Sequence, residues 1–300
     1  MIYSIGLDLG GTNIKGLAVT VSGKVLAEIN VPTGDAGDKR WIQNVDRARA
    51  NLQGELGEEP DFIGLAAPGL AARDHRSIAF MPERLHGLEN LVWQEYFDVS
   101  QPVPVLNDAQ AALLGEVWRG AARGSSNVIL LTLGTGVGGA AMVDGRLLHG
   151  HLGRAGHFGH LSLNPQGPPD ITGTPGSLED AIGDATIQKR SQGRFDSTRK
   201  LANAVRRGDR EARRVWQDSL RTLAAATASL INTLDPETVI LGGGIARAGV
   251  TLFRPLRQFL DKFEWRPGGS KTRIVPARLG DRAGAFGAAW NAIQFGAEQK

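Results

Sequence analysis

The chain contains no cysteine, which excludes disulfides and thiolate metal sites. It also lacks any apolar run near the ~18 residues of a membrane span, and no cationic-then-apolar leader opens it. We therefore expect a cytoplasmic protein with no membrane partner. Basic and acidic residues nearly balance, at 34 and 31, and the densest basic stretch, 206–214, has acids interleaved, as in a solvated helix start. Nucleic acid is not an expected partner.

What the chain does have is a repeated order of elements over 300 residues. Apolar periodicity predicts three strands, then helix, strand and helix, in each half of the chain. In the first half, the expected strands are 3–8, 15–21, 24–31, 62–67 and 103–106, and the expected helices are 41–56 and 109–118. In the second half, the expected strands are 127–133, 138–143, 146–148, 238–241 and 273–276, and the expected helices are 209–234, 252–263 and 283–295. This order indicates internal duplication, whereas 150–180 is expected to be irregular.

Two glycine turns stand in matching places of the two halves, at Asp8-Leu9-Gly10-Gly11-Thr12-Asn13 and Leu133-Gly134-Thr135-Gly136-Val137-Gly138-Gly139. Each lies between apolar runs, which predicts strand, turn, strand. A tight hairpin explains either turn alone, but the pair favours a polyphosphate approached by bare backbone from both sides. The second turn also fits G-x-G-x-x-G. A strand follows it instead of a helix, however, which argues against a dinucleotide site.

Carboxylates stand at the ends of two expected strands. Asp8 precedes the first turn, where it could hold Mg²⁺ through water or cap the turn, and we favour the metal role. Asn107-Asp108 lies between a strand and a helix. Asp108 is equally explained as a helix cap or as a general base at the carboxyl end of the strand.

Two further motifs lie in the second half. Gly156-His157-Phe158-Gly159-His160 carries two histidines that could bind a metal, although no third ligand is evident. They fit equally well on the surface, or in a polar ligand-binding loop with Glu179. Gly242-Gly243-Gly244 follows an apolar strand, either as a tight left-handed turn or as bare backbone that a nucleoside approaches.

Taken together, these residues resemble the ROK family of sugar kinases, bacterial glucokinase-like enzymes with the actin/hexokinase fold. The resemblance runs nearly end to end and rests on six motifs in the family's order. They are Asp8-Leu9-Gly10-Gly11-Thr12, Ala67-Pro68-Gly69, Asn107-Asp108-Ala109, Leu133 to Gly139, Gly156-x-x-Gly159-His160, and Asp235-Pro236-Glu237 with Val239 to Gly244. It implies an α/β, ribonuclease H-like, duplicated ATPase fold. Its expected domains are 1–112 with the C-terminal helix 287–300, and 113–286, with a cleft between them.

The resemblance implies transfer of the γ-phosphoryl group of Mg-ATP to a sugar hydroxyl, with the 6-OH as the expected acceptor. Asp108 would be the general base, and Asp8 would orient Mg²⁺ through water. The implied nucleotide contacts are Gly10, Gly11, Thr12, Asn13, Gly134, Thr135, Gly136, Gly243 and Gly244. The implied sugar contacts are Gly69, Asn107, Asp108, His157, His160 and Glu179.

The chain departs from the family in a zinc motif. Family members commonly hold a structural zinc with one histidine and the three cysteines of C-x-C-G-x-x-G-C-x-E. The matching stretch here ends at Glu179 and has Asp170, Thr172 and Ser177 in place of the cysteines. We expect no structural zinc and a loop held by hydrogen bonds and prolines.

A second departure concerns the sugar. The family's Glu-x-Gly-His reads His157-Phe158-Gly159-His160, so an imidazole with one acceptor replaces a carboxylate. We expect a hexose or amino sugar other than glucose. One alternative is a catalytically silent sugar- or nucleotide-binding relative. Another is a DNA-binding regulator of the family, for whose winged-helix segment we see no room before Asp8. A homodimer is compatible with the resemblance.

Overall fold

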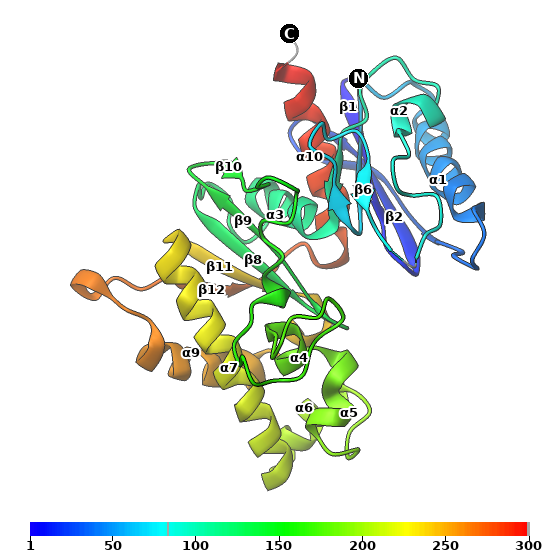
Figure 1. Ribbon diagram of the computed structural model, residues 1–300. Coiled ribbons are helices and arrows are strands. Elements are labelled where there is room, and N and C mark those ends of the chain that lie inside the picture. Colours follow the sequence, from blue (N-terminus) through cyan, green and yellow to red (C-terminus); the bar gives the residue numbers. More distant parts are fainter. Residues whose placement is uncertain (83, 299–300) are drawn as a thin grey trace. The chain divides into compact units, whose positions relative to one another are not determined.

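A computed structural model describes residues 1–82 and 84–298 and divides into two compact units (Figure 1). Unit 1 contains Met1–Gly124, Leu147–Ala155 and Arg278–Lys300, and unit 2 contains Ser125–Arg146 and Gly156–Ala277. These limits differ from the expected boundaries at 112 and 287, because two helices that pack on each other, α3 (Asp108–Arg119) and α10 (Ala283–Glu298), both lie whole in unit 1. The last two residues of the expected helix, 299–300, lie outside the described residues.

The sheet of unit 1 has the strand order β3-β2-β1-β4-β7. Its strands are β1 (Tyr3–Leu9), β2 (Asn13–Thr20), β3 (Val25–Pro32), β4 (Phe62–Ala67) and β7 (Val105–Asn107). The first three pair antiparallel as hairpins, whereas β1, β4 and β7 are parallel. Because parallel strands end at one edge of a sheet, Asp8 and Asn107 are brought to the same edge.

Helices cover both faces of this sheet because β1 alternates its side chains between them. Ile5 and Leu7 join one apolar cluster with residues of α1 (Arg40–Leu56). On the opposite face, a Cβ at Gly6 would collide with the backbone of α10, and so would one at Gly64 in β4. These two glycines therefore let α10 lie directly on the sheet. A short hairpin of β5 (Leu70–Ala71) and β6 (Ile78–Phe80), then α2 (Trp93–Tyr96), complete unit 1.

Unit 2 repeats the sheet of unit 1 with the strand order β10-β9-β8-β11-β12. The strands are β8 (Val128–Leu133), β9 (Val137–Val143), β10 (Arg146–Leu147), β11 (Thr238–Gly242) and β12 (Arg273–Pro276). As in unit 1, an antiparallel hairpin of β8 and β9 adjoins a parallel set, here β8, β11 and β12. This shared topology confirms the predicted internal repeat.

The helices of unit 2 include several that the sequence did not reveal. Those that it did not reveal are α4 (Leu178–Ile182), α5 (Ile187–Arg190), α6 (Thr198–Arg206) and α8 (Gly243–Ala246), and the others are α7 (Arg210–Leu234) and α9 (Val250–Phe263). The long helices α7 and α9 confirm the expected ranges to within two residues. Across residues 1–82 and 84–298, no helix has both the length and the apolar character needed to cross a bilayer.

Candidate active site

The first glycine turn, residues 10–13, joins β1 to β2 in unit 1 and is held in one conformation. Gly10 N–H donates to the Asn13 carbonyl at 3.0 Å. Thr33 fastens the turn from outside, because its hydroxyl donates to the Gly10 carbonyl at 2.6 Å and its N–H to the Thr12 carbonyl at 2.8 Å. The turn is thus a preorganised stretch of backbone beside Asp8.

The carboxylate of Asp8 has more negative than positive charge around it. Its side chain lies against Gly284 near the start of α10, where a Cβ would collide with Asp8 Oδ2. Burial, and then the negative charges of Asp108 and Asp281, raise the pKa of Asp8 to about 7, and only Lys15 opposes them. A divalent cation would relieve this imbalance, so the residues present fit the Mg²⁺ role that we expected.

Asp108 begins α3 at the same edge of the sheet. The residue as a whole is exposed to solvent. The surrounding protein nevertheless shields its carboxylate from water, and this desolvation raises the pKa of Asp108. Hydrogen bonds from Ala109 N–H and from the Asn107 side chain oppose that rise without cancelling it. Asp108 is therefore a carboxylate with increased basicity, which suits proton abstraction.

Asn107 caps α3 and also binds the strand end beside it. Its Oδ1 accepts from the N–H groups of Ala109 and Gln110, at 2.9 and 3.4 Å. Its Nδ2 donates to the Gly69 carbonyl at 2.9 Å. Gly69 has φ +101°, and a Cβ there would lie 2.5 Å from the Phe80 carbonyl oxygen. Four expected residues of unit 1, Asp8, Gly69, Asn107 and Asp108, thus belong to neighbouring parallel strand ends.

The second glycine turn, residues 134–136, joins β8 to β9 in unit 2. Gly134 N–H donates to the Gly136 carbonyl at 2.9 Å. The carbonyls of Gly134 and Thr135 accept from Asp184 and Ala185, at 2.9 and 3.0 Å. On its other side, Val137 N–H donates to Glu179 Oε2 at 2.8 Å. One oxygen of Glu179, expected to bind sugar, is therefore occupied by the turn.

The second glycine turn opens into a pocket of about 680 Å³ within unit 2. Gly134, Thr135, Asp184, Arg199, Asn203 and Gly244 are among its lining residues. Gly244 leaves open space where a side chain would stand, whereas Gly243, at φ +82°, packs so tightly on Leu133 that a Cβ would collide with the Leu133 carbonyl. Gly243 therefore shapes the turn and Gly244 lines the pocket.

Asp184, Arg199 and Asn203 were missed by sequence reasoning. The chain from 178 to 206 forms helices of four to nine residues, which are too short to give a clear periodic pattern in the sequence. The sequence did contain one signal for the start of α6, namely Ser197, a residue type that often caps helices. In the structure its side chain caps α6 by accepting from Lys200 N–H.

His160 is fixed by a buried carboxylate. Its Nδ1 lies 2.8 Å from Oδ2 of Asp170, whose side chain has no exposed surface. Because a carboxylate only accepts, Nδ1 carries the proton and Nε2 is left for a ligand. Burial acts against ionisation of Asp170, but hydrogen bonds from His160, Thr172 and Thr174 outweigh it and hold its pKa well below the ordinary value.

The three positions that the resemblance matches to cysteines take hydrogen-bonding roles in the loop. Asp170 Oδ1 accepts from Thr172 N–H and Oγ1–H, both at 2.8 Å. Ser177 caps α4 by accepting from Asp180 N–H. Among the described residues, no three or more His, Asp or Glu side chains gather to hold a metal ion. Burial and then the neighbouring His160 lower the pKa of His157, which therefore faces the loop as a neutral imidazole.

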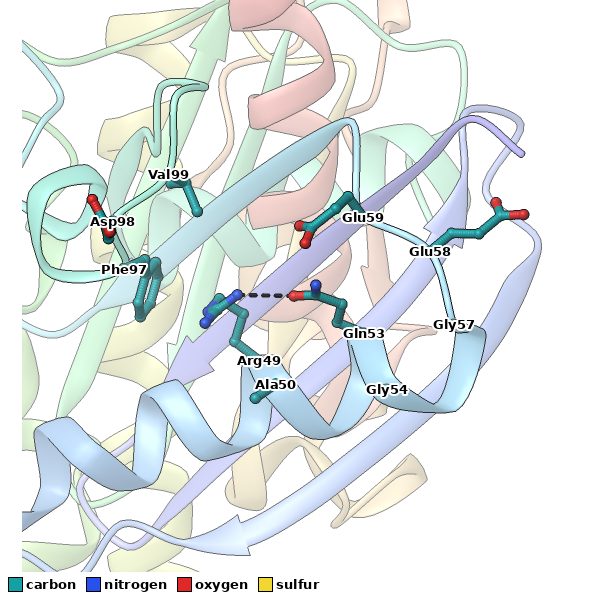
Figure 2. A pocket seen from close by; sticks show the side chains of 10 residues that line it. All are labelled: Arg49, Ala50, Gln53, Gly54, Gly57, Glu58, Glu59, Phe97, Asp98 and Val99. Carbon is teal, nitrogen blue, oxygen red and sulfur yellow. Dashed lines mark hydrogen bonds between the residues drawn. The ribbon is translucent and has the colours of Figure 1, made fainter.

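A second hollow of about 610 Å³ lies in unit 1 at the end of α1 (Figure 2). Arg49 donates to Gln53 Oε1 at 2.9 Å, and its guanidinium lies 5.1 Å from the centre of the Phe97 ring. None of the expected site residues lines it, and its main cation is already paired with Asp46. We assign it no chemistry.

Comparison with known proteins identifies the family of this chain. A model of the ROK family matches residues 4–294. A glucokinase of Halalkalibacterium halodurans is 34% identical, over 96% of this chain and 94% of that protein. An N-acetylmannosamine kinase of Pasteurella multocida is 32% identical, over 95% of each.

Among solved structures, a ROK family glucokinase from Streptomyces griseus, in complex with glucose and AMPPNP, has a TM-score of 0.80 and 28% identity, covering 97% of this chain and 99% of that one. The match spans both sheets of the chain. The resemblance found in the sequence motifs is confirmed: this chain belongs to the ROK family and has its actin/hexokinase-like fold.

Proposed function

We propose that this protein is an ATP-dependent sugar kinase, with a hexose or amino sugar as the acceptor and its 6-OH as the attacking group. The observation that carries the proposal is the position of two carboxylates, Asp8 and Asp108, at one edge of a sheet whose first hairpin is a rigid glycine turn. Paired carboxylates beside backbone donors suit phosphoryl transfer, in which positioning and charge neutralisation supply most of the rate.

Asp108 acts as the general base. Its carboxylate takes the proton of the sugar hydroxyl as that oxygen forms a bond to the γ-phosphorus. The bond between the γ-phosphorus and the β–γ bridging oxygen breaks, and ADP leaves with its electron pair. The raised pKa of Asp108 strengthens its basicity, and it also requires a pH high enough to keep the group ionised.

The nucleotide contacts are assigned to both glycine turns and to the pocket of unit 2. Residues 10–13 and 134–136 offer backbone to the phosphates, and Gly243 and Gly244 approach the adenosine. Asp8 would hold Mg²⁺ through water, and the bound ion would supply charge neutralisation at the phosphates. The buried, charge-poor setting of Asp8 supports this assignment.

Sugar contacts are assigned to Gly69, Asn107, His157, His160 and Glu179. The relatives named above are a glucokinase and an N-acetylmannosamine kinase, so both hexoses and amino sugars are candidate phosphoryl acceptors. His157 is the residue to which we assign the choice between them, because it offers one acceptor where a carboxylate offers several.

The test is sugar-dependent ADP release from Mg-ATP across a panel of hexoses and N-acetylated amino sugars. We expect a clear signal with at least one sugar, and a loss of about 10³-fold or more in kcat for Asp108→Asn. Asp98→Asn, at an exposed position of the other hollow, is the matched control and should retain full activity. Intact ATP binding with no turnover on any sugar would leave a binding-only protein.

A further inference from the structure

One cation of unit 1 lies directly on the first glycine turn. Arg84 stands in the segment between β6 and α2, and its guanidinium covers Gly11. A Cβ built on Gly11 would overlap Arg84 Nη2 and would lie 2.9 Å from Cζ. The position where a Gly11 side chain would stand is therefore filled by a positive charge.

This guanidinium has no anion of its own. Among residues 1–82 and 84–298, Arg84 makes no hydrogen bond and no ion pair. Other arginines of unit 1 do have carboxylate partners, as Arg49 has Asp46 and Arg282 has Glu28. A group with five N–H donors and no partner, beside a turn suited to phosphate, is poised for an external anion.

The backbone that carries Arg84 is anchored. Leu85 N–H donates to Asp35 Oδ2 at 3.2 Å, and Leu88 N–H to the Leu85 carbonyl at 2.9 Å. Leu85 and Leu88 are both buried in the core of unit 1. The fold thus fixes the base of the side chain beside the turn and leaves its charged end exposed.

We propose that Arg84 is a catalytic residue whose guanidinium binds the γ-phosphoryl group of ATP at the first glycine turn. The assignment rests on the proposed kinase function and adds a residue that the sequence motifs did not contain. A planar guanidinium can donate two parallel hydrogen bonds to phosphate oxygens. As the sugar oxygen bonds to phosphorus and the bond to ADP breaks, Arg84 offsets the negative charge on the equatorial oxygens.

The first measurement is equilibrium binding, which does not depend on turnover. Because only ATP has a γ-phosphate, Arg84→Gln should weaken Mg-ATP about 10-fold or more and leave Mg-ADP within about 2-fold of wild type. Lys39→Gln is the matched control. It removes a positive charge that covers Gly87, in the same segment as Arg84, instead of Gly11, and it should preserve both affinities.

The second measurement is steady-state turnover. We expect Arg84→Gln to lower kcat about 10²- to 10³-fold with little change in the KM of the sugar, and Arg84→Lys to restore part of that loss. Because the side chain is exposed, thermal unfolding should match wild type.

Each outcome is decisive. An unchanged ratio of ATP to ADP affinity in Arg84→Gln overturns the assignment, and so does a change confined to the sugar KM, which would place Arg84 at the sugar. If wild type binds ATP more tightly than Arg84→Gln does but phosphorylates no sugar, the kinase function is overturned and the phosphate contact is supported. A chain that binds neither nucleotide overturns both.

Discussion

Asn107 donates its side-chain Nδ2–H to the carbonyl of Gly69 at 2.9 Å, across the two strand ends that β4 and β7 bring together. The same side chain caps α3 through its Oδ1. One amide therefore fixes both the start of the helix that presents Asp108 and the glycine that follows the neighbouring strand.

These two roles of Asn107 can be separated. Asn107→Ala loses both and should lower the free energy of unfolding by about 1–3 kcal/mol. Asn107→Ser keeps a capping oxygen but cannot donate to Gly69, so it should retain more of the stability while kcat/KM still falls. Urea denaturation and initial rates measure the two effects. Equal stability of the two variants would show that the cap contributes nothing.

Asp8 should make the unliganded protein less stable as pH rises. Its pKa is about 7 in the fold and near 3.8 in the unfolded chain, so the folded state binds more protons between those values. Its stability therefore declines from about pH 4 to about pH 7. Asp8→Asn should be more stable than wild type at pH 8, by up to about 4 kcal/mol, with little difference at pH 4. The same variant should lose activity.

The measurement for Asp8 is chemical denaturation at both pH values, without Mg²⁺ and nucleotide. Asp98→Asn serves as a control for the loss of one negative charge. A variant that is no more stable than wild type at pH 8 would show that the ionised Asp8 carboxylate does not destabilise the folded protein.

The loop around Asp170 should be independent of zinc. A zinc-selective chelator, with Mg²⁺ kept in excess, should change neither thermal unfolding nor turnover. Asp170→Ala leaves His160 and the neighbouring N–H groups unpaired and should cost about 1.5–3 kcal/mol at pH 7. Because the pKa of Asp170 is lowered, this contribution is present above the unfolded pKa of about 3.9 and is lost as pH falls further. A chelator-sensitive wild type would refute the zinc-free loop.

Gly243 and Gly244 form a matched pair. Gly243→Ala must adopt φ near +82° and push against the Leu133 carbonyl, so we expect a loss of about 2–4 kcal/mol in stability and weaker nucleotide binding. Gly244→Ala meets open space, so stability should stay close to wild type while ATP affinity falls. Calorimetric unfolding and ATP titration measure the two quantities. Unchanged ATP affinity in Gly244→Ala would remove Gly244 from the nucleotide site.

His157→Glu should raise kcat/KM for glucose relative to the amino sugars, because it supplies a second acceptor oxygen. His157→Gln is the neutral control, which offers acceptor and donor without charge. The lowered pKa keeps His157 neutral near pH 7, so wild-type sugar preference should not change between pH 7 and 8. Identical sugar preferences in all three proteins would exclude His157 as the specificity residue.

The regular elements could be predicted from the sequence because local signals agreed with the fold. Gly23, at φ +79°, lies in the turn between β2 and β3, and the strands of this hairpin were predicted to within two residues. The motifs of the candidate site were equally visible, since glycine turns and strand-end carboxylates are local patterns. Their contacts were not visible, because Asn107 and Gly69 are far apart in the sequence.

The missed features all depend on tertiary packing. Arg84 has no motif around it, and only the fold brings its guanidinium to Gly11. Glu179 was expected to bind sugar alone, but the position of α4 beside β9 lets one of its oxygens accept from Val137 N–H. The hairpin of β5 and β6 was too short for a periodic signal to detect.

The packing of α10 on Gly6 and Gly64 also bears on the order in which the chain folds during synthesis. The sheet strands of unit 1 lie within residues 3–107, yet the helix that covers one face of that sheet is translated after every residue of unit 2. Every residue of unit 2 has left the ribosome before α10 appears. We therefore expect unit 2 to fold first, while the sheet of unit 1 keeps an apolar face exposed and available to chaperones until α10 has been synthesised.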